Sequence, residues 1–175
     1  RGFFVGVDNP ERFALFSRCV LEIAKNIFPP DVLHCHDWQA GLGPVLLKTA
    51  YASDPALKGI PCVFTIHNLG YQGLFAPDAL FRAGLGPELF TMEMLEFYGQ
   101  VNFLKGAAVY SDSITTVSKK YAQEIQTAEY GFGLDGVLRE RAGRVRGILN
   151  GVDYAEWDPS VDRFIAAHYS AANLD

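Results

Sequence analysis

Two segments of the chain change abruptly from apolar residues to imidazole, carboxylate and amide side chains, and then to glycine. The apolar pair Val32-Leu33 leads into residues 34–42, and the apolar run at residues 62–66 leads into residues 67–73. A short apolar run that ends in polar and turn residues is typical of a buried parallel strand. The carboxyl ends of parallel strands meet at the edge where open α/β sheets bind their ligands. The sequence therefore predicts a ligand site that the two segments form together.

Helix and strand patterns alternate along the chain. Asn9 and Pro10 suit the cap and first turn of a helix that ends before Pro29. Its apolar residues recur at helical spacing, so we expect them to form the buried face: Phe13, Phe16, Val20, Ala24 and Ile27. Further helices are expected over residues 39–52, 102–111 and, capped by Ser118, up to about residue 127, and strands over 31–34, 62–66, 113–117 and 145–149.

The segment 69–102 is rich in glycine and proline and carries only short helical patterns, near 76–82 and 87–95. A loop is expected over residues 130–136, before another short helix. The alternation of strands and helices predicts an α/β fold with a parallel sheet and right-handed crossovers. No composition shift marks an internal boundary, so residues 1–175 are expected to form a single domain.

Composition excludes several classes of protein. The 175 residues are 49% hydrophobic and 20% charged, which is typical of a globular chain. The net charge of -5 and the lack of any Lys/Arg run argue against nucleic-acid binding. The apolar runs are too short to span a membrane and no signal peptide is visible. Cys19, Cys35 and Cys62 form no CxxC motif and indicate reduced thiols in the core of a cytoplasmic protein.

The first polar segment permits two kinds of site. His34 and His36 share one face of a strand, and with Asp37 they could form a metal site. We favour the alternative that the histidines only make hydrogen bonds at the strand end, because no third ligand stands at a supporting spacing. Asp37 lies at the first turn of the next helix, so it is either a helix cap or an active-site carboxylate.

The second segment is more informative, because it places His67 and Asn68 together at a strand end, although Asn68 could also be a turn residue. Asn150-Gly151 is a common turn pair, and the two glycines of Tyr130-Gly131-Phe132-Gly133 make only a weak phosphate-binding pattern. What remains is a group of neutral hydrogen-bonding and aromatic side chains at strand ends. Such groups suit a polyhydroxylated ligand, so the residues alone predict an α/β domain that binds a sugar or a nucleotide sugar.

The chain resembles bacterial glycogen synthases and plant starch synthases along essentially its whole length. Its motifs match that family in order and spacing: His36-Asp37-Trp38, Ala40-Gly41-Leu42, Thr65-Ile66-His67-Asn68, Tyr71-Gln72-Gly73, Asn102-Phe103-Leu104-Lys105, Thr116-Val117-Ser118, Tyr130-Gly131-Phe132-Gly133-Leu134-Asp135-Gly136 and Leu149-Asn150-Gly151-Val152-Asp153. The resemblance implies a GT-B glycosyltransferase, in which two Rossmann-like domains face each other across a cleft. It also implies that this chain is an incomplete domain, the latter part of the N-terminal catalytic domain, without its first strands and without the C-terminal domain.

The reaction that the resemblance implies is transfer of glucose from ADP-glucose to an α-1,4-glucan, with retention of configuration and with no metal or other cofactor. The C-terminal domain would be the partner that binds the diphosphate, so we expect these 175 residues alone to be inactive. The implied location is the cytoplasm, or the plastid for a plant protein. Two alternatives remain open: a related sucrose synthase-like enzyme, and a non-catalytic glucan-binding relative.

The resemblance also assigns roles to residues of this chain. His67 would contact the donor glucose, and Asp37 would lie on the acceptor side of the cleft. The implied substrate-binding residues are Trp38, Gln39, Asn68, Tyr71 and Asn150, with Asn150 on a sugar hydroxyl, Asn68 supporting its loop and Tyr71 lining the glucan path. Many members of the family have histidine where this chain has Gln39, and glutamine cannot transfer a proton near neutral pH.

Overall fold

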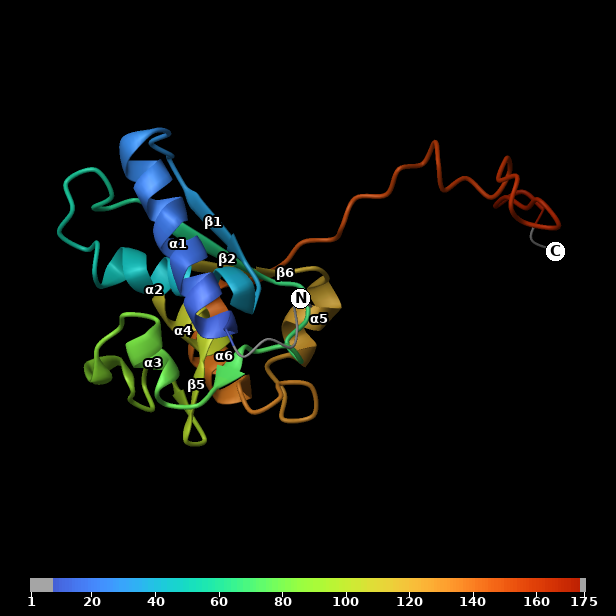
Figure 1. Ribbon diagram of the computed structural model, residues 1–175. Coiled ribbons are helices and arrows are strands. Elements are labelled where there is room, and N and C mark those ends of the chain that lie inside the picture. Colours follow the sequence, from blue (N-terminus) through green and yellow to red (C-terminus); the bar gives the residue numbers. More distant parts are fainter. Residues whose placement is uncertain (1–7, 174–175) are drawn as a thin grey trace.

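A four-stranded parallel sheet forms the centre of the protein (Figure 1). The computed structural model describes residues 8–173. The strand order is β1-β2-β6-β7, with β1 at Leu33–His36, β2 at Cys62–Ile66, β6 at Ser113–Thr116 and β7 at Val145–Gly147. His36 pairs with Thr65, and Ile66 pairs with Thr116, so the carboxyl ends of these strands lie at one edge. The expected α/β fold with a parallel, Rossmann-like sheet is confirmed.

Helices pack on this sheet and on each other. Helix α2 lies against α1 and α4, and α5 lies against β6 and β7. The helices are α1 at Asn9–Asn26, α2 at Leu42–Lys48, α4 at Phe103–Tyr110, α5 at Lys119–Glu124 and α6 at Asp135–Glu140, with short 3-10 turns η1 at Trp38–Ala40 and η3 at Ala142–Arg144. The predicted cap at Ser118 is used, because Ser118 Oγ accepts the N–H groups of Lys120 and Tyr121. Asn102 was expected as the first residue of a helix but is the N-cap of α4, where its Oδ1 accepts the N–H group of Lys105.

A small antiparallel sheet, which the sequence patterns did not predict, occupies the segment between β2 and α4. Its order is β3-β5-β4, with β3 at Leu74–Phe75, β4 at Glu96–Phe97 and β5 at Gln100–Asn102. The predicted short helices are α3 at Ala79–Arg82 and the turn η2 at Pro87–Leu89. Strands of two or three residues carry no detectable periodicity, because alternation needs several residues to show.

Several predicted details are wrong. Strand β1 begins and ends later than residues 31–34, so both histidines lie on the strand itself. Asp8, not Asn9, holds the N-cap position of α1, and Asn9 is buried. Of the expected apolar face, Phe16 and Ile27 are exposed, while Ser17 and Leu21 are buried. Cys19 is exposed, although Cys35 and Cys62 are buried as expected.

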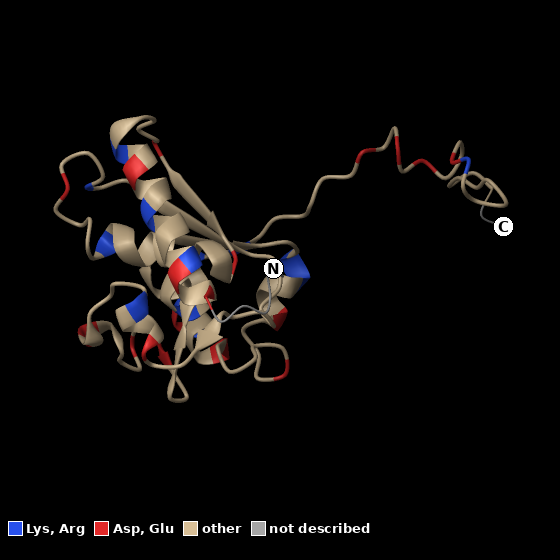
Figure 2. Ribbon diagram, in the orientation of Figure 1, with Lys and Arg blue, Asp and Glu red and all other residues tan. Residues whose placement is uncertain are grey.

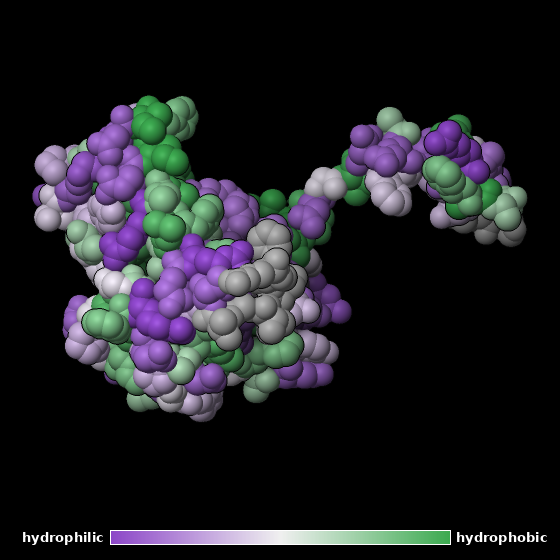
Figure 3. Space-filling model, viewed as in Figure 1, coloured by the Kyte–Doolittle hydropathy of each residue, from purple (hydrophilic) through white to green (hydrophobic). Residues whose placement is uncertain are grey.

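Apolar surface gathers at the C-terminal end of α1. Ile23, Ile27, Phe28 and Val32 are exposed there. Figure 3 shows hydrophobic surface at the top of the molecule. Lys and Arg are scattered and interspersed with Asp and Glu (Figure 2). After β7 the chain leaves the globular body (Figure 1). Among the helices of residues 8–173, none is both long enough and apolar enough to cross a bilayer.

The side chain of Trp38 joins the two sheets. It is only 4% exposed and packs edge-on against Phe13, with ring centroids 4.9 Å apart, and against Phe75, at 5.8 Å. Gly73 lies directly against its ring, because a Cβ at position 73 would be 2.6 Å from Trp38 Cε3. The backbone of Gly73 also has a positive φ of 64°, which favours glycine.

We expect Gly73→Ala to destabilise the protein by about 2–5 kcal/mol, because it adds an unfavourable backbone conformation to a steric clash in the core. Gly59→Ala is the matched control, since Gly59 also has a positive φ, of 85°, but has open space where the methyl group of alanine would lie. The control should cost about 1–2 kcal/mol. Chemical denaturation measures both values, and equal losses would contradict the packing role of Gly73.

Candidate functional site

The carboxyl edge of the parallel sheet brings His36, Asp37 and His67 together. His36 ends β1, and His67 directly follows β2. The Nδ1 atom of His36 is 3.0 Å from the Nε2 atom of His67, so one of these rings donates a hydrogen bond to the other. The ring centroids of His34 and His36 are 4.1 Å apart, and those of His36 and His67 are 5.3 Å apart. The predicted meeting of the two polar segments is therefore present in the fold.

Asp37 connects the ends of the two strands. Its backbone N–H donates to the carbonyl oxygen of Thr65, and its Oδ1 accepts the backbone N–H of His67 at 2.8 Å. Asp37 stands at the N-cap position of η1, but its side chain makes no capping hydrogen bond. Its φ of 53° with ψ of -178° is seldom adopted by residues other than glycine. The carboxylate thus fixes the His67 backbone instead of capping the helix.

His34 belongs to a chain of hydrogen bonds that crosses three strands. Its Nε2 lies 2.7 Å from Thr65 Oγ1, which lies 2.6 Å from Thr115 Oγ1. This arrangement agrees with the interpretation that the strand-end histidines make hydrogen bonds. Within the described part of the chain, no three His, Cys, Asp or Glu side chains lie close enough to hold a metal ion together.

The environment of His36 disfavours its protonated form. Burial lowers the pKa of His36 below its usual value, and the neighbouring His34 and His67 lower the pKa further, while Asp37 opposes them. A neutral imidazole at this position can accept a hydrogen bond with one nitrogen and donate with the other. His36 is therefore suited to orient the His67 ring.

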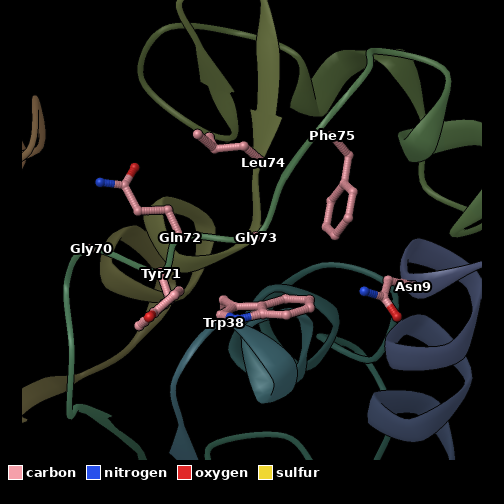
Figure 4. Close-up of a pocket in the computed structure, with 8 residues that line it drawn as sticks. All are labelled: Asn9, Trp38, Gly70, Tyr71, Gln72, Gly73, Leu74 and Phe75. Carbon is pink, nitrogen blue, oxygen red and sulfur yellow. The ribbon is translucent and has the colours of Figure 1, made fainter. Parts of the chain in front are cut away.

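A small hollow lies beside this edge, on the loop that follows His67 (Figure 4). Its volume is ≈ 180 Å³, and it is lined by Asn9, Trp38 and residues 70–75. Figure 4 shows the Trp38 ring between Tyr71 on one side and Phe75 and Asn9 on the other. Tyr71 is 53% exposed at the hollow, whereas Trp38 is buried beneath it.

The other predicted residues differ in their surroundings. Asn68 Oδ1 accepts the Gly70 N–H at 2.9 Å, so Asn68 forms the turn of its loop. Gln39 is half-buried in η1. Asn150 is exposed on the segment that leaves the globular body after β7 (Figure 1), whereas His36, Asp37 and His67 are in mutual contact.

A buried polar network, which the sequence patterns did not predict, holds the loops around the hollow. Asn102 Nδ2 donates to Gln72 Oε1 at 2.6 Å, and Gln72 Nε2 donates to the carbonyl oxygen of Phe132 at 3.1 Å. From the sequence, Gln72 and Asn102 could have been singled out through the motifs that contain them, which are rich in glycine and aromatic residues. The network ties together three motifs that are far apart in the sequence, so each fixes the position of the others.

We expect the stability of the protein to fall as the pH drops below about 6.5, the ordinary value for histidine, because the folded state lowers the pKa of His36. The unfolded chain binds the proton more readily, so the contribution of His36 is complete above that pH and is lost below it. His36→Gln should flatten the dependence of Tm on pH between about 7.5 and 5.5. Asn26→Ala provides the control, because asparagine does not titrate and Asn26 lies at the exposed end of α1, so this variant should keep the wild-type slope.

The chain is similar to known glucan synthases. A family model described as the starch synthase catalytic domain matches residues 4–140. The chain is 64% identical over 167 residues to a glycogen synthase of Koribacter versatilis, covering 95% of this chain and 34% of that protein. It is 49% identical over 173 residues to a glycogen synthase of Thermotoga maritima, covering 98% of this chain and 36% of that protein.

A solved structure is similar as well. The catalytic domain of Starch Synthase IV from Arabidopsis thaliana, bound to ADP and acarbose, matches with a TM-score of 0.81 and 37% sequence identity, covering 98% of this chain and 36% of that one. The chain thus spans about a third of the length of the curated relatives it matches. On the strength of the match over residues 4–140, this chain belongs to the family defined by the starch synthase catalytic domain.

Proposed function

We propose that the protein containing this chain is a glucan synthase that transfers glucose from ADP-glucose to the end of an α-1,4-glucan, with retention of configuration. Membership of the starch synthase family supports this reaction, and the Arabidopsis relative was solved with ADP and acarbose bound. In this proposal the chain is the latter part of the N-terminal domain of a GT-B enzyme. A second domain of the same protein would supply the groups that bind the diphosphate.

The observation that carries the proposal is the fixed position of His67 at the sheet edge. The Asp37 carboxylate holds the His67 backbone N–H at 2.8 Å, and the His36 ring contacts His67 Nε2 at 3.0 Å. With Nε2 engaged by His36, the Nδ1 atom and the backbone carbonyl of His67 are the groups left to meet a sugar. Positioning of this kind lowers an activation barrier because the polar groups need no reorganisation during the reaction.

The surrounding residues take supporting roles in the proposal. Asn68 shapes the loop through its bond to Gly70, and Tyr71 offers a half-exposed ring to the glucan. Trp38 supports that loop from below, and Gln39 is a neutral hydrogen-bonding group beside Asp37. Asn150 would bind a sugar hydroxyl once the second domain closes the cleft over the exposed segment.

We also propose that the protein works in the cytoplasm. Cys35 and Cys62 are free thiols on the adjacent strands β1 and β2, and both are buried. Neighbouring unpaired thiols are typical of proteins in a reducing compartment.

We expect His67→Ala in the full-length protein to lower kcat by about 10²–10³-fold while KM for ADP-glucose changes little, because the lost contact acts mainly in the transition state. Asn150→Ala should have a similar but smaller effect. Asn26→Ala is the control, because Asn26 lies at the exposed end of α1 and its side chain bonds to groups of Glu22 there. Steady-state glucose transfer to glycogen measures all three variants. A folded His67→Ala enzyme with wild-type kcat would overturn the role of His67.

We expect the activity of the full-length protein to survive thorough chelation. The proposal assigns the charge of the leaving diphosphate to basic side chains of the second domain, so no metal ion is needed for it. Incubation with EDTA followed by the same transfer assay tests this. If activity were lost and then restored by a divalent ion, His34, His36 and Asp37 would again become candidates for metal ligands.

A further inference from the structure

A second and larger groove lies apart from the His67 edge. Its volume is ≈ 570 Å³, and it lies between the hairpin of β4 and β5 and the helix α6. The residues that matter for its chemistry are Glu93, Phe97, Tyr98, Lys105, Gly136 and Glu140. The loop that carries Phe132 and Gly133 lies between this groove and the Trp38 hollow, since Phe132 bonds to Gln72 and Gly133 lies against Phe97 and Tyr98.

Tyr98 stands in an unfavourable position at the tip of the hairpin. Tyr98 and Gly99 have φ values of 50° and 79°, so both adopt the left-handed conformation of a tight hairpin turn. Asparagine or glycine normally takes the first of these positions, because a bulky side chain is disfavoured there. Yet Tyr98 is 81% exposed, and its ring lies edge-on to Phe97 with centroids 4.7 Å apart. The fold therefore gains no buried core residue from this tyrosine.

The hairpin that presents Tyr98 is firmly held. Glu96 Oε1 accepts the Gly99 N–H at 2.7 Å. The ammonium group of Lys105, a residue only 4% exposed, donates to the carbonyl oxygens of Met92 and Glu96, both at 2.5 Å. Burial lowers the pKa of Lys105, in keeping with a cation enclosed by the hairpin base. These hydrogen bonds therefore fix the position of the hairpin that carries the Phe97–Tyr98 ring pair.

Gly136 is a second residue that the fold does not require. It lies within α6, where glycine is a poor helix former. A Cβ at this position would meet nothing within 4 Å, so no close packing demands glycine. Because Gly136 lines the groove, a larger side chain here would project into it. Two departures from local preference, at Tyr98 and Gly136, therefore flank the same groove, and such departures concentrate at functional sites.

The chemistry of the groove selects a neutral, polyhydroxylated ligand. Glu93, Glu96 and Glu140 make its lining acidic, while the charge of Lys105 is directed at backbone carbonyls. Phosphates and other anions are therefore disfavoured. Carboxylates accept hydrogen bonds from sugar hydroxyls, and exposed aromatic rings pack against the apolar face of a sugar. The volume falls in the range of pockets that enclose small ligands.

We propose that this groove binds a stretch of α-glucan chain away from the end that reacts. The proposal rests on the proposed function, which supplies the identity of the sugar polymer. Exposed rings mark a path between the groove and the His67 edge: Phe132 is 57% exposed and Tyr71 is 53% exposed. The Phe132 ring lies close to the backbone just before Tyr71, because a Cβ on Gly70 would lie 3.8 Å from it.

Two variants of the full-length protein test the groove. Tyr98→Asn removes the ring and suits the left-handed turn, and Gly136→Leu fills the groove from a position with free space. Each should weaken binding of glycogen by about tenfold. Gly136→Ala controls for the helix: it should keep or slightly raise the wild-type Tm and leave glycogen binding unchanged. Phe81→Ala controls for loss of an exposed ring, since Phe81 is 86% exposed on α3.

Glucan binding is measured directly, by calorimetry without any nucleotide sugar, so the outcome does not depend on catalysis. Unchanged glycogen affinity in both variants would overturn the proposal, as would an equal loss of affinity in the Gly136→Ala or Phe81→Ala control, which indicates an effect unrelated to the groove. Failure of the wild-type protein to bind glycogen would overturn it as well. If the wild-type protein binds glycogen through this groove but transfers no glucose, the groove stands and the proposed function fails.

Discussion

The parallel pairing of β1 with β2 is the constraint on which the site depends. Pairing of His36 with Thr65 brings Asp37, the residue after His36, and His67, two residues after Thr65, close enough for the Asp37 carboxylate to accept the His67 N–H. A shift of one residue along β1 would turn its histidines to the other face of the sheet. The register is held because Phe64 and Ile66 are fully buried. Burial of the central strand therefore determines the geometry of the polar edge.

Buried polar groups hold the loops beside this sheet edge in position. Asn102 bonds to Gln72, which bonds to the Phe132 backbone, and Lys105 holds the hairpin base through two carbonyl groups. Each of these groups would be costly to bury without its partners, so the loops can rearrange only if several bonds break together. The hollow beside His67 and the groove beside Tyr98 are thus parts of one connected framework.

Three residues other than glycine have a positive φ: Asp37, Tyr98 and Phe132, counted over the part of the chain that the structure describes. Asp37 lies in the candidate site, Tyr98 lines the groove, and Phe132 lies between them. Each such conformation costs about 1–3 kcal/mol and persists only where the surrounding contacts impose it. The polar contacts of Asp37 and the Gln72 bond to Phe132 are contacts of this kind. The same framework that orders the loops therefore maintains these unfavourable conformations.

The sequence by itself determined the fold class, strand β2 and the cap at Ser118, because these depend on local patterns of apolar and capping residues. It also predicted that His67 and Asp37 share one edge, since parallel strands end together. Only the tertiary structure decided that Asp37 binds the His67 backbone, and that Leu21 instead of Ile27 faces the core. It alone revealed the antiparallel sheet and the groove beside Tyr98. These features arise from contacts between segments distant in sequence, and short strands and side-chain partners leave no periodic signal from which they could be predicted.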